Sequence, residues 1–164
     1  MQTFTSKSTS INSRKAPAVY SMKKAVAIMA GKSVIDVGGG RFDTAAPVAA
    51  EYGASVAVYD PYNRDADHNA RTLSKIYDVA VISNVLNVID SPAARADVVK
   101  LAGSKAAVIL VTVYEGSGSG QGRQTGVDSW QENRRTADYV GEISAALPDW
   151  QVTRFGRLII TKSC

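Results

Sequence analysis

The chain has 164 residues, of which 45% are hydrophobic and 21% are charged. This length and composition are those of one globular domain that can bury a sizeable core. No apolar run approaches the roughly 18 residues of a membrane-spanning helix, and the N-terminus has no apolar signal region, so we expect a cytoplasmic protein. A single histidine and a single terminal cysteine argue against a structural zinc site.

The excess of positive charge lies at the N-terminus. The first 32 residues contain six lysines or arginines and no acid, whereas the remaining residues carry 13 bases and 15 acids. Residues 1–16 are also rich in Ser, Thr and Lys, which predicts a flexible basic arm ahead of one domain over residues 17–164. Such an arm is consistent both with steering toward nucleic acid and with a solvated tail.

Helix and strand patterns alternate along the domain. Apolar residues in helical rhythm predict helices over residues 17–30, 44–52, 93–101 and 130–147, with a partly helical segment over 65–76. Nearly continuous apolar runs predict buried strands over residues 33–37, 55–59, 78–82 and 106–113. A Gly- and Ser-rich stretch over 116–126 reads as a mobile loop, and residues 151–154 and 157–161 as a hairpin. The order predicts a three-layer α/β sandwich with a mostly parallel sheet and an antiparallel C-terminal hairpin.

The first predicted strand ends in a turn of three glycines, Gly38, Gly39 and Gly40. Glycines at this point let a ligand approach the main chain, because no Cβ stands in the way. The second predicted strand ends on Asp60, whose carboxylate can accept hydrogen bonds from both hydroxyls of a ribose. The unit therefore predicts a cofactor that contains a nucleoside.

Acids around this turn argue against a dinucleotide. Nicotinamide and flavin sites use the order G-x-G-x-x-G, but the third glycine position is Asp43, whose charge would repel a pyrophosphate. Asp36, two residues before the first glycine, suits a ligand with an ammonium or sulfonium charge; its alternative role is to brace the loop. S-adenosylmethionine carries both cations and a ribose, without phosphate. A nicotinamide-dependent reductase is therefore the least favoured interpretation.

Three motifs in order resemble those of class I S-adenosylmethionine-dependent methyltransferases. Residues 34–40 are similar to the first motif of this family, Asp60 to its acidic second motif, and residues 78–89 to its fourth strand and the following loop. Val85-Leu-Asn-Val-Ile89 is most similar to methyltransferases associated with DNA phosphorothioation and to small phage or plasmid methyltransferases. The resemblance covers roughly residues 15–162 and implies a Rossmann-like methyltransferase fold with S-adenosylmethionine as the cofactor.

The chain departs from this family at Phe42, where the first motif often has a further glycine, and in two further places. Only 18 residues separate Asp60 from Asp78, so we expect the third strand of the family fold to be truncated or lost. The Asn-Pro-Pro-Tyr segment of DNA amino-methyltransferases is replaced by Asn84-Val-Leu-Asn87. We predict that Asn84 and Asn87 contact the reacting groups, Asn84 also touching the cofactor, since both follow a central strand. Their alternative roles are to start the loop and to cap a short helix.

Further candidates lie beside the turn and in the glycine-rich loop. Pro61 and Tyr62 can flank adenine with flat apolar surface, or Tyr62 belongs to the core. Arg123 and Trp130 can close over a substrate, or they belong to a plain surface connection. His68 is chemically able to act as a base, but a lone exposed histidine more often has no catalytic role. Likewise, Arg134 and Arg135 suit either a phosphate-bearing substrate or a solvated helix face.

The sequence thus predicts an S-adenosylmethionine-dependent methyltransferase without a metal ion. No Ser-His-Asp or paired-carboxylate arrangement is visible, and methyl transfer needs positioning more than acid–base relays. The basic arm and the phosphorothioation-linked resemblance favour nucleic acid or a nucleotide as substrate, with a small metabolite as the alternative. A non-catalytic protein that binds the cofactor and regulates or inhibits a partner is a second alternative.

Overall fold

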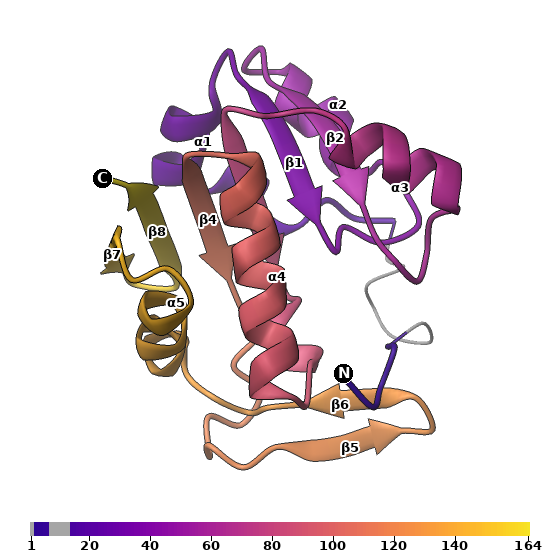
Figure 1. The fold of residues 1–164 in the computed structure, drawn as a ribbon, viewed down its shortest axis with the longest axis vertical. Coiled ribbons are helices and arrows are strands. Elements are labelled where there is room, and N and C mark those ends of the chain that lie inside the picture. The colour runs from indigo at the N-terminus through magenta and orange to yellow at the C-terminus, as the bar shows by residue number, and fades with distance from the viewer. Residues whose placement is uncertain (1, 7–13) are drawn as a thin grey trace.

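A six-stranded sheet lies at the centre of the fold, in the order β2-β1-β3-β4-β8-β7 (Figure 1). The computed structural model describes residues 2–6 and 14–164. Strands β1 to β4 run parallel, and β8 and β7 complete the sheet as the predicted antiparallel hairpin. The strands are β1 (Ser33–Val37), β2 (Ser55–Tyr59), β3 (Val79–Ser83), β4 (Val108–Thr112), β7 (Trp150–Phe155) and β8 (Leu158–Ser163).

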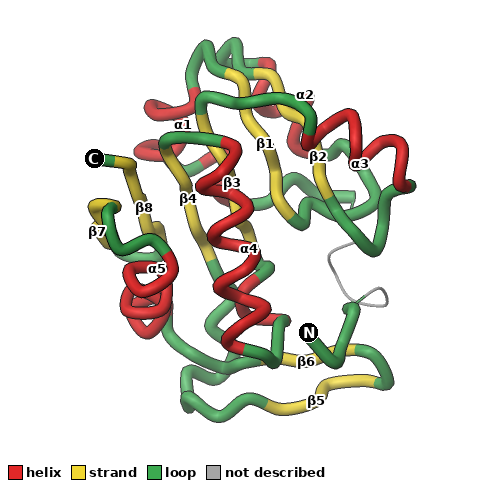
Figure 2. Tube along the Cα trace, in the orientation of Figure 1, coloured by secondary structure: helices red, strands yellow, loops and turns green. Residues whose placement is uncertain are grey.

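Helices cover both faces of the sheet, which gives the three predicted layers (Figures 1 and 2). Helices α3, α4 and α5 pack on one face, and α1 and α2 pack on the other together with the short 3-10 helix η2. The predicted first helix is divided at Met22, and the helix predicted over 93–101 is longer than expected. The bounds are η2 (Ala18–Ser21), α1 (Lys23–Met29), α2 (Ala45–Ala50), α3 (Ala66–Leu73), α4 (Pro92–Lys105) and α5 (Val140–Ala146).

Alternation along the strands divides the core between the two faces. Ile35 and Ile82 belong to the apolar cluster beneath α4 and α5, whereas Val34 and Val81 belong to the cluster beneath α1 and α2. All four side chains are fully buried, as expected for parallel strands covered on both faces. Each contributes roughly 1.5–3 kcal/mol of burial, so the strand ends that follow them are firmly positioned.

Among residues 2–6 and 14–164 there is no counterpart of the third strand that the resemblance implies, in agreement with the expectation that it is truncated or lost. The chain passes from β2 through α3 directly into β3, and among the described residues no strand pairs with the outer edge of β2. Side chains of α3 cover this edge instead. Nε2 of His68 lies 2.7 Å, and the Thr72 hydroxyl 3.5 Å, from the carbonyl oxygen of Val58. Because a carbonyl only accepts, the His68 ring donates there, which gives this histidine a structural role.

The helix predicted over residues 130–147 is wrong in its first part. Residues Ser129–Gln131 form strand β6, which pairs with β5 (Arg123–Gly126) in a separate two-stranded sheet. Helical structure begins only with the 3-10 helix η4 (Thr136–Tyr139), directly before α5. Asn133 has a φ of 53°, which is left-handed and interrupts a right-handed helix. Tertiary contacts of residues 131–133, described below, outweigh the local helical pattern. Strand β5 also lies within the stretch that the sequence predicts as a mobile loop, so part of that stretch is ordered.

The predicted flexible arm falls partly on residues 1 and 7–13, which lie outside the described residues. Residues 2–6, which we call the strap, lie beside β6 at the end of the sheet where the parallel strands finish (Figure 1). None of the helices within residues 2–6 and 14–164 has the length and apolar character that crossing a bilayer requires.

Candidate functional site

The glycine turn, Gly38–Gly40, is held close to its neighbours. Gly38 and Gly40 have φ values of 82° and 81°, a region that favours glycine. A Cβ on Gly38 would lie 2.6 Å from a Val85 methyl carbon, and one on Gly39 would lie 2.8 Å from Cγ of Asp36. The first two glycines are therefore required by close packing and leave a bare main chain at the carboxyl end of β1.

Asp60 lies at the end of β2, and its buried carboxylate ties two turns together. Oδ2 accepts from the Gly40 N–H at 2.9 Å, while Oδ1 accepts from the N–H groups of Tyr62 and Asn63 at 2.9 and 3.0 Å. The Asn63 side chain also donates to Oδ1, at 3.1 Å. Oδ2 thus carries one hydrogen bond and Oδ1 carries three, which leaves acceptor capacity on Oδ2.

Arg64 holds the glycine turn from its other side. Its Nε donates to the Gly40 carbonyl at 2.8 Å, and its guanidinium pairs with Asp43 at 2.8 Å. Asp43, which replaces the third glycine of a dinucleotide fingerprint, therefore serves as the partner of an arginine that clamps the turn. The turn is fixed before any ligand arrives.

Asp36 lies beneath Gly39, fully buried. Its Oδ2 accepts from the Tyr20 hydroxyl at 2.8 Å, but its Oδ1 has no hydrogen-bond partner. Burial raises the pKa of Asp36 to about 6, against the lowering effect of the Tyr20 hydrogen bond. Asp36 lines neither of the cavities described next, so its influence on a ligand passes through the turn above it.

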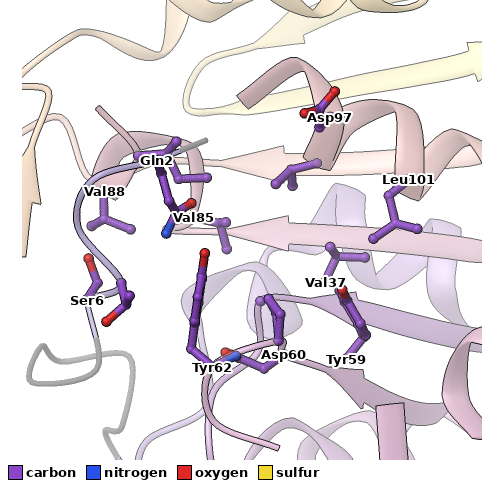
Figure 3. Close-up of a pocket in the computed structure, with 15 residues that line it drawn as sticks. Gln2, Ser6, Val37, Tyr59, Asp60, Tyr62, Val85, Val88, Asp97 and Leu101 are labelled. Atoms are coloured by element: carbon purple, nitrogen blue, oxygen red, sulfur yellow. The ribbon is translucent and has the colours of Figure 1, made fainter. Parts of the chain in front are cut away.

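A cavity of about 200 Å³, which we call the apolar cavity, opens between the glycine turn and α4. Tyr62 projects into it toward Gln2 and Val85, while Leu101 and Asp97 face it from α4 (Figure 3). The predicted residues Gly38, Asp60, Pro61 and Tyr62 all line this cavity. The remaining lining residues are mainly apolar: Val37, Tyr59, Val88, Ile89 and Val98, with Thr5 and Ser6 of the strap.

The strap closes one side of the apolar cavity. The N–H of Thr3 donates to Asp90 at 2.9 Å, and the N–H of Ser6 donates to the carbonyl of Asp128 at 2.9 Å. Phe4 stacks on Trp130 with the ring centroids 5.6 Å apart. Residues from the start of the chain are thus attached to the β5–β6 hairpin and to the loop before α4.

A second cavity of about 630 Å³, which we call the polar cavity, lies between the glycine turn and the hairpin. Gly38 and Val88 line both cavities, so the two adjoin at the carboxyl ends of the parallel strands, and we call them together the cleft. Arg123 and Trp130, predicted to touch substrate, both line the polar cavity, as do Gly39, Asn84, Asn87, Ser83, Tyr114, Ser117 and Asn133. Gly40 lines neither cavity.

The two predicted asparagines differ in their surroundings. Asn84 is exposed, has a φ of 56°, and donates its N–H to the Thr112 carbonyl at 2.9 Å. Asn87 is buried, and its Nδ2 donates to Oε1 of Gln131 at 3.1 Å. Gln131 in turn donates from Nε2 to the Tyr114 carbonyl at 3.0 Å.

This chain of amides fixes the orientation of Asn87. A carbonyl oxygen only accepts, so Gln131 must turn its NH2 toward Tyr114 and its oxygen toward Asn87. Asn87 must then present its NH2 to Gln131, and its Oδ1 is left buried without a hydrogen-bond partner. An unpaired buried acceptor costs free energy, and a water molecule or a ligand group that donates to Asn87 Oδ1 would remove that cost.

A buried ion network attaches the hairpin to the domain. Arg95 of α4 pairs with Glu132 and with Glu142 of α5, each at 2.8 Å, and also donates to the Ile89 carbonyl. Burial opposes ionisation of Glu142, but hydrogen bonds from Arg95 and Arg134 outweigh it and hold the pKa of this carboxyl below its usual value. The sequence analysis missed Gln131, Glu132 and Arg95, whose partners are far away in the chain.

The sequence matches no known family model and no curated protein. The structure, in contrast, is similar to solved methyltransferases. Magnesium protoporphyrin IX methyltransferase from Synechocystis PCC 6803, solved with bound S-adenosylmethionine, has a TM-score of 0.56 and 14% identity over 90% of this chain and 77% of its own. The N-terminal domain of EvdMO1, solved in the presence of S-adenosylhomocysteine and D-fucose, has a TM-score of 0.55 and 13% identity over 93% and 85%.

A third structure, an O-methyltransferase family protein from Burkholderia thailandensis, has a TM-score of 0.51 and 14% identity over 89% of this chain and 54% of its own. The chain has the fold of class I methyltransferases. At these identities the likeness concerns the fold, and the six-stranded sheet with its closing hairpin agrees with the predicted fold class.

Proposed function

We propose that this protein is an S-adenosylmethionine-dependent methyltransferase. The observation that carries the proposal is the pair of adjoining cavities, one apolar and one polar, that share Gly38 of the glycine turn. Ligands of open α/β sheets bind at this edge, beyond the carboxyl ends of the strands. Structures with the same fold were solved with S-adenosylmethionine or S-adenosylhomocysteine, which supports the cofactor side of the proposal.

The residues around the apolar cavity fit the nucleoside part of this cofactor. Asp60 keeps acceptor capacity on Oδ2 for a ribose hydroxyl, although most of its hydrogen bonds hold the turns. Pro61 and Tyr62 provide flat surface for adenine on the β2 side, and Val85 lies opposite Tyr62. We assign cofactor binding to these residues together with the glycine turn.

The charged end of the cofactor is favoured by Asp36. The unpaired Oδ1 of this buried carboxyl places negative potential directly behind Gly39. A sulfonium or ammonium group on the other side of the bare main chain is stabilised by that potential when Asp36 is ionised. Gly39 and Asn84 line the polar cavity where that end would reach it.

The catalytic contribution of the protein is positioning. When bound, S-adenosylmethionine would supply an electrophilic methyl group for in-line displacement, with S-adenosylhomocysteine as the leaving group and the proton of the acceptor released to water. Asn87 Oδ1 accepts a hydrogen bond from the N–H or O–H of the acceptor, which aims the lone pair of the nucleophile. Asn84 is the second candidate at this point, and the hairpin residues Arg123 and Trp130 enclose the acceptor.

Isothermal titration with S-adenosylhomocysteine and S-adenosylmethionine tests the proposal. We expect dissociation constants below about 100 µM, which corresponds to roughly 5.5 kcal/mol of binding free energy. If neither compound binds below millimolar concentration, the proposed function is wrong.

The acceptor is the finer part of the proposal. The likeness of residues 85–89 to phosphorothioation-associated and to phage or plasmid methyltransferases favours nucleic acid or a nucleotide over a small metabolite. A tritiated-methyl screen on nucleic acid, protein extract and metabolites would distinguish these classes. A gel-shift assay with and without residues 1–16 tests the basic arm. Cofactor binding without any methylated product would indicate the non-catalytic regulator instead.

A further inference from the structure

Charge divides the cleft into two unlike parts. In the part of the chain that the structure describes, the charged residues lining the apolar cavity are Asp60 and Asp97. The polar cavity is lined by Lys15 and Arg123 and by no described acid. A cationic cofactor suits the first part, whereas the second part attracts an anion.

A further hollow of about 490 Å³, which we call the arginine groove, lies next to the polar cavity. Gly116 and Ser117 line both hollows, so the groove and the polar cavity adjoin. The charged residues of the groove come from three separate segments: Glu115 after β4, Arg135 before η4, and Arg154 and Arg157 in the closing hairpin.

The single acid of the groove does not neutralise its arginines. Glu115 Oε1 accepts from the N–H and the hydroxyl of Thr136, both at 2.8 Å. These two hydrogen bonds, followed by the nearby charges of Arg157 and Arg135, lower the pKa of Glu115. The carboxyl is therefore ionised at neutral pH but is used to begin η4.

Ion pairing among these groups is weak. Within the described residues, their one ion pair joins Arg157 to Glu115 at 3.9 Å, and the Arg157 side chain is 79% exposed. A long, exposed pair of this kind contributes little to stability. Arg95 and Arg134, in contrast, are paired at close range with acids of the buried network. Three guanidinium groups against one carboxylate leave two positive charges uncompensated in the groove.

We propose that the arginine groove binds a phosphate monoester carried by the methyl acceptor. A phosphate monoester bears about −1.5 to −2 charges at pH 7, which matches the uncompensated charge of the groove. A guanidinium group can donate two parallel hydrogen bonds to phosphate oxygens. Three such groups line the hollow, one from the segment before η4 and two from the closing hairpin. The acceptor then lies with its phosphate among Arg135, Arg154 and Arg157 and its reacting end near Asn87. The reaction part of this inference rests on the proposed function, whereas binding of phosphate does not.

Inorganic phosphate is the probe for the test, titrated into full-length protein at constant ionic strength. We expect the backbone amide resonances of Gly116, Gly118 and Gly156 to shift and saturate, with an apparent Kd in the low millimolar range. The triple variant Arg135→Gln, Arg154→Gln, Arg157→Gln should weaken this binding at least tenfold. The matched control, Arg71→Gln on the exposed side of α3, should leave it unchanged.

Three results would overturn the proposal. They are shifts that do not saturate, shifts that are equal in the triple variant, and acetate binding as tightly as phosphate, which would indicate a carboxylate acceptor. The arginines are exposed, so we expect the triple variant to fold, and Arg157→Gln alone provides the comparison should it not. S-adenosylhomocysteine titration of the same samples separates the two proposals. Cofactor binding without phosphate binding overturns the groove alone, and phosphate binding without cofactor binding overturns the proposed function alone.

Discussion

The cleft has a glycine-turn half, around Gly38–Gly40 and Asp60, and a hairpin half, around Asn87 and Gln131. The two halves are assembled from very different stretches of chain. In the first, Asp60 and Arg64 bind Gly40 across separations of 20 and 24 residues. In the second, Asn87 meets Gln131 across 44 residues, and Thr5 meets Asp128 across 123. The first half is fixed by backbone geometry within one βαβ unit, while the second depends on completed tertiary structure.

This difference implies that the two halves can be damaged separately. Backbone-determined sites fail when a side chain intrudes, and sites held by buried charges fail when one partner is removed. Each variant below therefore has an expected effect on one half and an expected lack of effect on the other.

The largest effect is expected in the hairpin half, from Arg95→Met. Removing the guanidinium leaves Glu132 with an uncompensated buried charge and frees part of Glu142, which should cost about 3–5 kcal/mol of unfolding free energy. Urea denaturation measures the change. The exposed control Arg71→Met should stay within about 0.5 kcal/mol of the natural protein. Equal stability of the two variants would show that the network does not hold the hairpin.

A pH effect of nearly this size is expected in the glycine-turn half. The pKa of Asp36 is raised by burial from 3.8 to about 6, so the folded state binds more protons than the unfolded state in this window. The contribution of Asp36 to stability is therefore fully present below the unfolded pKa and is lost as the pH rises through the folded pKa. The loss is about 2 kcal/mol between pH 4 and 6 and about 3 kcal/mol in all. Glu115 and Glu142 have lowered pKa values, so their contribution is present above the unfolded pKa and is lost as the pH falls further.

The variant Asp36→Asn isolates this contribution. It should remove the decline between pH 4 and 6 in denaturation experiments, because the amide does not titrate. Asp149→Asn, which changes an exposed carboxyl, should retain the decline. A pH profile identical in all three proteins would contradict the assignment to Asp36.

Gly38→Ala should abolish most cofactor binding while sparing the hairpin. Its Cβ would overlap Val85, at 2.6 Å, in a backbone conformation that disfavours alanine. We expect at least a 100-fold loss of S-adenosylhomocysteine affinity, or about 2.7 kcal/mol. Gly31→Ala is the matched control, because Gly31 has a similar φ of 71° with open space around it. A comparable loss in both variants would point to backbone strain alone.

Asn87→Ala acts where the two halves meet. We expect methyl transfer to slow about 30-fold, corresponding to the roughly 2 kcal/mol of one buried hydrogen bond, with cofactor affinity within threefold of the natural protein. Single-turnover kinetics with the acceptor from the methyl-transfer screen measure the rate. Asn84→Gly, which keeps the positive φ, tests the other asparagine. A larger effect at position 84 would transfer the catalytic role to Asn84.

The smallest effect, on the rate of cofactor release, is expected where the strap stacks on the β5–β6 hairpin. Phe4→Ala removes the stacking of the strap on Trp130, which is worth about 0.5–1.5 kcal/mol. Because the strap lines the apolar cavity, S-adenosylhomocysteine should dissociate about fivefold faster in stopped-flow displacement. Phe155→Ala, at a half-exposed ring outside both cavities, should leave that rate unchanged. An unchanged rate in Phe4→Ala would mean that the strap does not limit cofactor exchange.

The sequence was sufficient to predict the glycine-turn half because its information is local. Three glycines after an apolar strand, an acid at the end of the next strand, and the short spacing from Asp60 to Asp78 each specify geometry over a few residues. The mostly parallel sheet, its antiparallel C-terminal hairpin and the shortened third-strand region follow from such patterns and were confirmed.

Strand β6 and the buried contacts of Gln131 and Glu132 could not be predicted from the sequence, for a physical reason. The helical pattern of residues 130–147 is genuine, but Gln131 and Glu132 gain buried hydrogen bonds and an ion pair outside a helix. The gain depends on Asn87 and Arg95, whose proximity only the folded chain creates. Sequence reasoning singled out Arg123 and Trp130, which line the polar cavity, without indicating the strands that carry them.

The outer edge of β2, which α3 covers, bears on whether the sheet can pair with a strand of another chain. An unpaired strand edge is a template for intermolecular sheet growth. With its outermost strand missing, this sheet relies on one short helix, through His68 and Thr72, to occupy an exposed carbonyl. Because α3 occupies this carbonyl, less of the β2 edge is open to pairing with a strand of another chain.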